Sequence, residues 1–256
     1  MKTVIGINNL IAIDQYAYAN HIQFFYRLGK HWKNDEFILC NPRRMTIDRM
    51  RNEAAKIALE AEADYLMFID DDVLVHPQAF DMLQRWDKDI IAGVTHIRGY
   101  PFHPMIFNFT DEDYKKNSYV DDYAVKAQPN GLLKCDAVGF SCVLMKVSLL
   151  KKVIPPFFIT AHNQTEDVFF CKRAKEQVPD LEIWVDTNCK TAHLLGSELI
   201  EPDSVELWKE FEEKRAPWIK GQEKKEKEQR GDRDPEHVKQ LLKVIENAEN
   251  LSVASV

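Results

Sequence analysis

The stretch YLMFIDDDVLVH, residues 65–76, decides the fold class. Its first half, 65–69, is an apolar run of the kind found in strands that are buried on both faces of a sheet. The run ends at three consecutive aspartates, Asp70, Asp71 and Asp72. One aspartate would suit the turn after a strand, but two carboxylates ~4 Å apart repel by roughly 4 kcal/mol at an effective dielectric of 20. We therefore expect a divalent cation with phosphate oxygens here, and expect loss of one charge to maintain or raise the melting temperature.

Apolar runs elsewhere in the chain alternate with helical patterns. The other strand-like runs are 4–7, 37–39, 90–94, 138–145 and 183–185. Helical spacing of apolar residues occurs over 47–61, with Thr46 as the expected N-cap, and over 80–86. This alternation predicts an α/β fold with a largely parallel sheet, whose ligands bind beyond the carboxyl ends of the strands. Residues 96–137 lack such periodicity and are expected to form loops and short antiparallel strands on one side of the sheet.

Composition excludes several classes of protein. The chain has 256 residues and a formal net charge of −7, so a general basic footprint for nucleic acid is absent. The five cysteines are irregularly spaced without a CxxC pair, which predicts reduced core thiols and no zinc site. We expect neither a signal peptide nor a membrane span, because polar residues interrupt every apolar stretch before ~20 residues. The sequence thus predicts a soluble, cytoplasmic protein.

The C-terminal part differs in composition from the rest. Residues 206–235 are dense in charges of both signs, and Asp234-Pro235 is typical of a new helix start. An apolar stripe follows at Val238, Leu241, Leu242 and Ile245. This pattern predicts a domain at 1–205 and a charged helical extension at 206–256. The stripe needs a partner, either the main domain or a second subunit, so a homo-oligomer through this helix is one expectation.

One long stretch carries a family resemblance. RMRNEAAKIALEAEADYLMFIDDDVLVHP, residues 49–77, resembles the nucleotide-sugar half of GT-A glycosyltransferases, especially family 2-like members, in which an Arg-Asn helix precedes a strand ending in a DxD motif. Segments 93–107, 138–153, 165–176 and 185–196 extend the resemblance in the family's order over about 1–200. It implies a GT-A-type (Rossmann-like) mixed, largely parallel sheet flanked by helices. The nucleotide-sugar half would be about 1–95 and the acceptor half 96–205.

The resemblance also implies roles for particular residues. Donor-binding residues would be Asn8, Arg51, Asn52, Asp70 and Asp71. Metal ligands for Mn²⁺ or Mg²⁺ would be Asp70, Asp72 and His193, with a neutral imidazole as a suitable third ligand. Asp167 would be the general base and Glu166 would orient the acceptor.

The residues alone leave alternatives open for these roles. Arg51 could form a structural ion pair with Asp48 or the aspartate triplet. Glu166 and Asp167 could only stabilise a helix dipole, and His193 could be a structural histidine. The Asn8-Asn9-Leu10 turn also departs from the family's Pro-x-x-Asn type of turn.

The implied activity is metal-dependent transfer of a sugar, with inversion, from a nucleotide-sugar donor to an acceptor hydroxyl. A UDP-sugar is the leading donor, and the acceptor would be a small molecule, a protein or a modified nucleobase. One alternative is a non-catalytic sugar-nucleotide or glycan-binding protein on the same fold. Another is a haloacid-dehalogenase-like phosphohydrolase with Asp70 as nucleophile, although Leu74 replaces the Thr or Val of that motif.

Overall fold

The computed structural model describes residues 1–9, 13–110, 116–161, 164–195 and 198–200, together with 205, 206, 209, 210 and 213. The chain separates into two compact units, Met1–Trp208 and Lys209–Val256. All elements described below belong to the first unit. The predicted helix over 234–245 and its oligomer contact lie outside the described residues.

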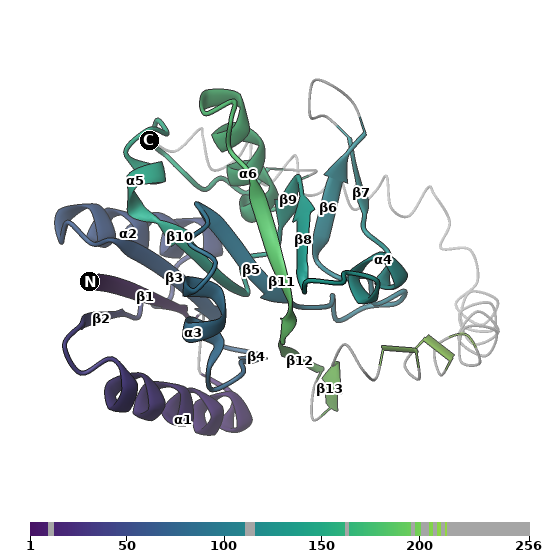
Figure 1. The fold of residues 1–256 in the computed structure, drawn as a ribbon, viewed down its shortest axis with the longest axis horizontal. Helices are drawn as coiled ribbons and strands as arrows, with labels where there is room; N and C mark the ends of the chain where they lie inside the picture. Colours follow the sequence, from purple (N-terminus) through teal and green to yellow (C-terminus); the bar gives the residue numbers. More distant parts are fainter. Residues whose placement is uncertain are drawn as a thin grey trace, which may run out of the picture. The chain divides into compact units, whose positions relative to one another are not determined.

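A seven-stranded sheet forms the centre of the first unit (Figure 1). Its strands, in spatial order, are β2 (Glu36–Cys40), β1 (Lys2–Asn8), β3 (Tyr65–Asp70), β10 (Cys142–Lys146), β5 (Ile90–Val94), β11 (Ile183–Lys190) and β8 (Leu132–Cys135). β2, β1, β3, β5 and β11 run in one direction, whereas β10 and β8 run in the other. The predicted mixed, mostly parallel sheet is therefore confirmed.

Two three-stranded sheets accompany the central sheet. One has the order β13 (Glu198–Ile200), β12 (Ala192–Leu195) and β4 (Val73–Leu74). The other has the order β7 (Asn117–Tyr119), β6 (Ile106–Phe109) and β9 (Ala137–Val138). Both are antiparallel. The second confirms the short antiparallel strands that the sequence predicted within 96–137.

Helices cover both faces of the central sheet. They are α1 (Gln15–His31), α2 (Ile47–Glu60), α3 (Ala79–Gln84), α4 (Asp122–Lys126), α5 (Val147–Leu150) and α6 (Glu166–Gln177). On β3, Leu66 and Phe68 pack into one core with α2, α5 and α6, whereas Met67 and Ile69 pack into the other core with α1 and α3. Alternate residues of one strand thus enter opposite cores, which explains why 65–69 is apolar without interruption.

Small residues bring α2 close to the sheet. Ala54, Ala55 and Ala58 are fully buried, and a Cβ on Gly6 of β1 would lie 3.1 Å from the Ala54 Cβ. This close packing fixes the helix whose first turns reach the carboxyl ends of β1 and β3. Thr46 occupies the N-cap position as predicted, but its side chain makes no capping hydrogen bond.

Two of the differences from the sequence prediction concern long elements. The strand expected at 138–145 is split into β9 and β10, because residues 139–141 leave the ladder and turn their main chain toward α2 and β3. Helix α1 was not predicted. It begins at Asp14, whose side chain accepts from the Tyr16 amide, and it buries residues at helical spacing: Ala17, His21, Phe24 and Leu28.

The cysteines and helices agree with two further expectations. All five cysteines are buried and unpaired, as predicted. Among the described helices, none combines the length and apolar character that crossing a bilayer requires.

Candidate functional site

The aspartate triplet lies at the carboxyl edge of the central sheet. Asp70 is the last residue of β3 and is the register partner of Asn8, the last residue of β1. An open cleft of about 610 Å³ begins here. Its lining consists of Asn8, Thr46, Ile47, Asp48, Met50, Asp70, Asp71, Asp72 and Thr160. The cleft therefore lies where an α/β sheet usually binds its ligands.

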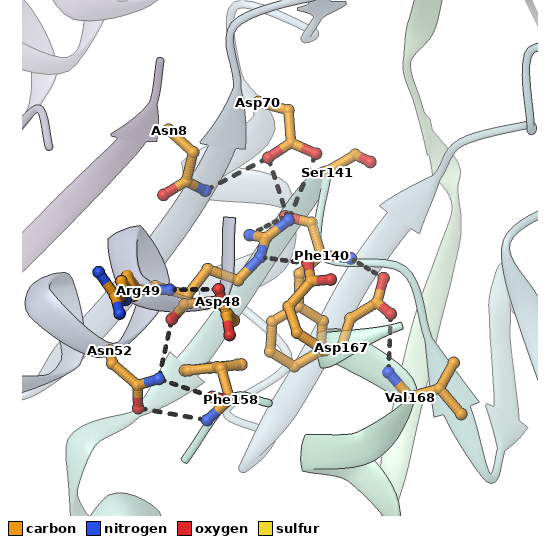
Figure 2. Close-up of polar contacts among 12 residues, drawn as sticks. Asn8, Asp48, Arg49, Asn52, Asp70, Phe140, Ser141, Phe158, Asp167 and Val168 are labelled. Carbon is orange, nitrogen blue, oxygen red and sulfur yellow. Dashed lines mark hydrogen bonds and ion pairs between the residues drawn. The ribbon is translucent and has the colours of Figure 1, made fainter. Parts of the chain in front are cut away.

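Arg51 is the central side chain of the site, and it is only 2% exposed. Its Nη2 atom donates to both oxygens of Asp70 at 3.1 and 3.4 Å, and its Nε atom donates to Glu166 Oε1 at 2.9 Å. Its Nη1 atom donates to the Phe140 carbonyl at 3.1 Å. The guanidinium also lies 5.0 Å from the centre of the Phe68 ring. These contacts join α2 to the end of β3 and to the 139–141 turn, whose Asp70 and Phe140 are labelled in Figure 2.

This arrangement gives Arg51 a positioning role. It does not line the cleft, and every nitrogen of its guanidinium is engaged with protein. Burial acts to lower the pKa of Arg51, but Asp70, Glu166 and Asp167 outweigh it and raise the pKa. Of the alternatives that the sequence left open, the ion pair with the triplet is the one observed. The donor-binding role that the resemblance implies for Arg51 stays a prediction, and the structure shows that Arg51 reaches the cleft through Asp70.

Glu166 and Asp167 form the buried first turn of α6. Burial raises the pKa of Glu166, and the Arg51 cation partly opposes that effect. Asp167 Oδ1 accepts from the Val168 amide at 2.7 Å, and Asp167 Oδ2 lies 3.4 Å from the Phe140 amide (Figure 2). Phe140 thus bonds to Arg51 through its carbonyl and to Asp167 through its amide. The structure brings Glu166 to Arg51, and leaves Asp167 as the member of the pair that does not contact the guanidinium.

Asp72 and His193 lie together, with 3.5 Å between Asp72 Oδ1 and His193 Nε2. They meet because β12 pairs with β4, the short strand that follows the triplet. Arg98 Nη1 contacts the other carboxylate oxygen of Asp72 at 2.9 Å. Burial would raise the pKa of Asp72, but His193 and Arg98 lower it. An aspartate with a lowered pKa stabilises the fold above its ordinary pKa of 3.8. This stabilising contribution acts against the relief of carboxylate repulsion on which the prediction for the melting temperature rests, and that prediction stays open for Asp72.

The orientation of His193 bears on metal binding. Its Nδ1 atom lies 2.8 Å from the His96 carbonyl oxygen, which can only accept, so Nδ1 carries a proton. In the neutral ring Nε2 then has a lone pair directed at a carboxylate oxygen. Nε2 is therefore the ring nitrogen that faces Asp72. An imidazole whose far nitrogen bonds to a carbonyl is the usual arrangement of a metal-ligating histidine.

The predicted metal triad is only partly assembled. Asp70 is turned to Arg51, so Asp72 and His193 are the two predicted ligands that lie together. Within the residues that the structure describes, no group of three or more His, Cys, Asp or Glu side chains is arranged to hold a metal ion. Asp72 and His193 are therefore a pair of candidate ligands without a third predicted ligand beside them.

The remaining predicted donor residues lie in two places. Asn8 and Asp71 line the cleft, and Asn8 Nδ2 donates to Asp70 Oδ1 at 3.3 Å. Asn52 is outside the cleft and bonds the main chain of Asp48, Phe157 and Phe158. Its amide donates twice and accepts twice, so it anchors the 157–158 segment to α2. The donor contact that the resemblance implies for Asn52 stays a prediction.

Several residues of the site were not individually predicted. Arg98 forms an ion pair with Asp72, and the His96 carbonyl faces His193. The cleft is also lined by Thr46, Asp48 and Thr160. Arg98 and His96 do lie in the segment 93–107, which was expected to border the donor and acceptor sites. No sequence signal distinguished them, because their contacts cross between elements far apart in the chain.

Comparisons with known proteins agree with the fold alone. No model of a protein family matches the sequence, and no curated protein matches it. Among solved structures, the crystal structure of A197 from STIV is similar, with a TM-score of 0.51 and 18% sequence identity. The similarity covers 79% of this chain and 91% of that one. It supports the α/β architecture and assigns no activity.

Proposed function

We propose that this protein is a metal-dependent GT-A-like glycosyltransferase that transfers a sugar from a nucleotide-sugar donor with inversion. The observation that carries the proposal is the bridge made by Arg51. It links Asp70, at the cleft, to Glu166, the neighbour of the candidate base Asp167, within one buried network. Glycosyl transfer needs a diphosphate site and a base in fixed relation to each other, and a rigid ion-pair bridge provides such a relation.

The donor would lie in the cleft with its diphosphate near Asp72 and His193. These two side chains would hold Mn²⁺ or Mg²⁺, which when bound supplies Lewis-acid neutralisation of the diphosphate leaving group. Asn8, Asp70 and Asp71 line the neighbouring part of the cleft, where the resemblance implies donor contacts. Arg51 would keep the Asp70 carboxylate in place.

The acceptor hydroxyl would lose its proton to Asp167. The two main-chain amides beside its oxygens fix the orientation of this carboxylate. Glu166 has a different role in this scheme, because its contact with Arg51 makes it a positioning residue. A positioned general base typically contributes about 10²–10⁴-fold to a rate.

The contacts of Asp70 argue against the phosphohydrolase alternative. A nucleophilic aspartate needs a free oxygen directed at phosphorus, whereas Arg51 binds both oxygens of Asp70. The non-catalytic sugar-nucleotide binder remains the other candidate, since it would share the cleft. Donor hydrolysis separates these two candidates, because a binding protein should show none.

Calorimetric titration of UDP with and without Mn²⁺ tests the proposal. We expect wild-type protein to bind UDP only with Mn²⁺, and Asp72→Asn to lose that binding. Asp180→Asn is the matched control, because Asp180 is exposed and precedes β11 at the opposite edge of the sheet. Equal binding by wild-type protein with and without Mn²⁺ would refute the metal-dependent mechanism, and unchanged binding by Asp72→Asn would remove the triplet from the site.

A further inference from the structure

An aromatic stack lies near the candidate base. The rings of His103 and Tyr119 are stacked, with centroids 4.7 Å apart and an interplanar angle of 23°. The Phe107 ring lies 4.7 Å from Tyr119 on the neighbouring strand. Phe107 is buried, but Tyr119 is 42% exposed. Tyr119 is thus the middle ring of the three, and its exposed part offers apolar area to a ligand.

The main chain attaches this stack to the site on two sides. The His103 carbonyl accepts from the Ile97 amide, one residue beyond His96, which supports His193. The Met105 carbonyl accepts from the Gly139 amide, one residue before Phe140, which bonds to Asp167. The stack is therefore fastened between the surroundings of the candidate metal ligand and those of the candidate base.

Tyr119 belongs to the small sheet that borders the helix of the candidate base. It is paired with Phe107 across β6 and β7, so both side chains are on the same face of the small sheet. That face packs into the core that contains α6, and β9 of the same sheet contacts α6 (Figure 1). Consistently, burial and then the Asp167 carboxylate raise the pKa of Tyr119. The sheet pairing and the contact of β9 with α6 thus place Tyr119 on the same side of the molecule as Asp167.

We propose that the Tyr119–His103 stack is the acceptor platform and that the acceptor is a saccharide. A sugar ring has a C–H-rich face that can pack on an aromatic ring, and hydroxyls at its rim that can reach a carboxylate. The surrounding charges favour a neutral acceptor, since Glu166, Asp167 and the triplet are acidic and the chain carries a net charge of −7. A nucleobase within a nucleic acid would bring phosphates into this acidic region, which is unfavourable. The inference rests on the proposed glycosyltransferase function.

Saturation-transfer NMR on the full-length protein tests the platform. The probes are methyl glycosides of neutral hexoses together with short neutral oligosaccharides, and uridine and adenosine form a separate arm. We expect saturation of aromatic protons to pass to the C–H protons of a glycoside. Tyr119→Ala should weaken that binding by about tenfold, the loss expected for one aromatic contact, whereas Tyr119→Phe should retain most of it.

The control is Tyr123→Ala, because Tyr123 is 82% exposed on α4 and belongs to no part of the proposed site. The inference is overturned if no glycoside receives saturation, whether or not the nucleosides do. It is also overturned if Tyr119→Ala leaves glycoside binding intact. The UDP titration is an independent readout. If UDP binds with Mn²⁺ but no glycoside binding depends on Tyr119, only the platform is refuted. If a glycoside binds through Tyr119 but UDP does not bind with Mn²⁺, the glycosyltransferase proposal is refuted and a saccharide-binding surface is left.

Discussion

Replacement of Arg51 by Met should destabilise the protein strongly, and more at neutral than at acidic pH. Methionine preserves much of the volume of the side chain but removes the cation that pairs with Asp70 and Glu166. Breaking a buried ion pair by removing one partner costs about 3–5 kcal/mol, because the other charge stays buried without compensation. For a chain of this size that corresponds to a fall in melting temperature of about 6–20 °C.

The dependence on pH follows from the pKa of Glu166. This pKa is raised above its ordinary value of 4.5, and Arg51 limits the rise. Between pH 4.5 and the raised pKa, the unfolded chain releases a proton that the folded chain keeps, so stability falls as pH rises. Without Arg51 the folded pKa rises further, and that loss continues to higher pH. The stability difference between wild type and variant should therefore be smallest at acidic pH and should widen toward neutral pH.

Urea unfolding at two pH values measures this difference. We expect the gap in unfolding free energy to be larger at about pH 8 than at about pH 5, by the linkage of protonation to folding. Glu166→Gln should restore part of the stability of the Met variant, which a double-mutant cycle detects. Arg49→Met is the matched control on the same helix, since Arg49 is exposed and should change stability little. A gap below about 1 kcal/mol, or one independent of pH, would refute the structural role given to Arg51.

Two further predictions concern the base and the packing of the sheet. Asp167→Asn should lower sugar transfer by about 10²–10⁴-fold while UDP binding measured by calorimetry stays near wild type, because a base acts on the acceptor proton; near-normal transfer would move the base to another residue. Gly93→Ala should lower the unfolding free energy by about 1–3 kcal/mol in urea titration, because the new Cβ would lie 2.6 Å from the Cys189 carbonyl oxygen. The control is Gly29→Ala in α1, whose new Cβ meets no atom within 4 Å. It should stabilise the protein by up to about 1 kcal/mol.

Sequence reasoning succeeded where the signal was local. Each buried strand of the parallel core is a continuous apolar run, and β3 was recognised together with the aspartates that end it. Helix α2 was recognised because its apolar residues keep helical spacing. Helix α1 was missed because exposed aromatic residues, including Tyr18 and Tyr26, obscure its apolar stripe. The 138–145 run was predicted as one strand because nothing in its composition shows that residues 139–141 turn toward α2.

The sequence by itself determined the α/β class, the positions of most central strands along the chain and the presence of acidic residues at a strand end and at a helix start. These features depend on neighbours within one element, so periodicity and composition reveal them. Only the tertiary structure decided what each side chain does. Arg51 and Glu166 are 115 positions apart, and their contact at 2.9 Å assigns both to a positioning network. Likewise, the pairing of β12 with β4 brings His193 to Asp72. Such contacts depend on how sheets and helices pack, and the chain encodes that packing through many weak interactions that no short motif displays.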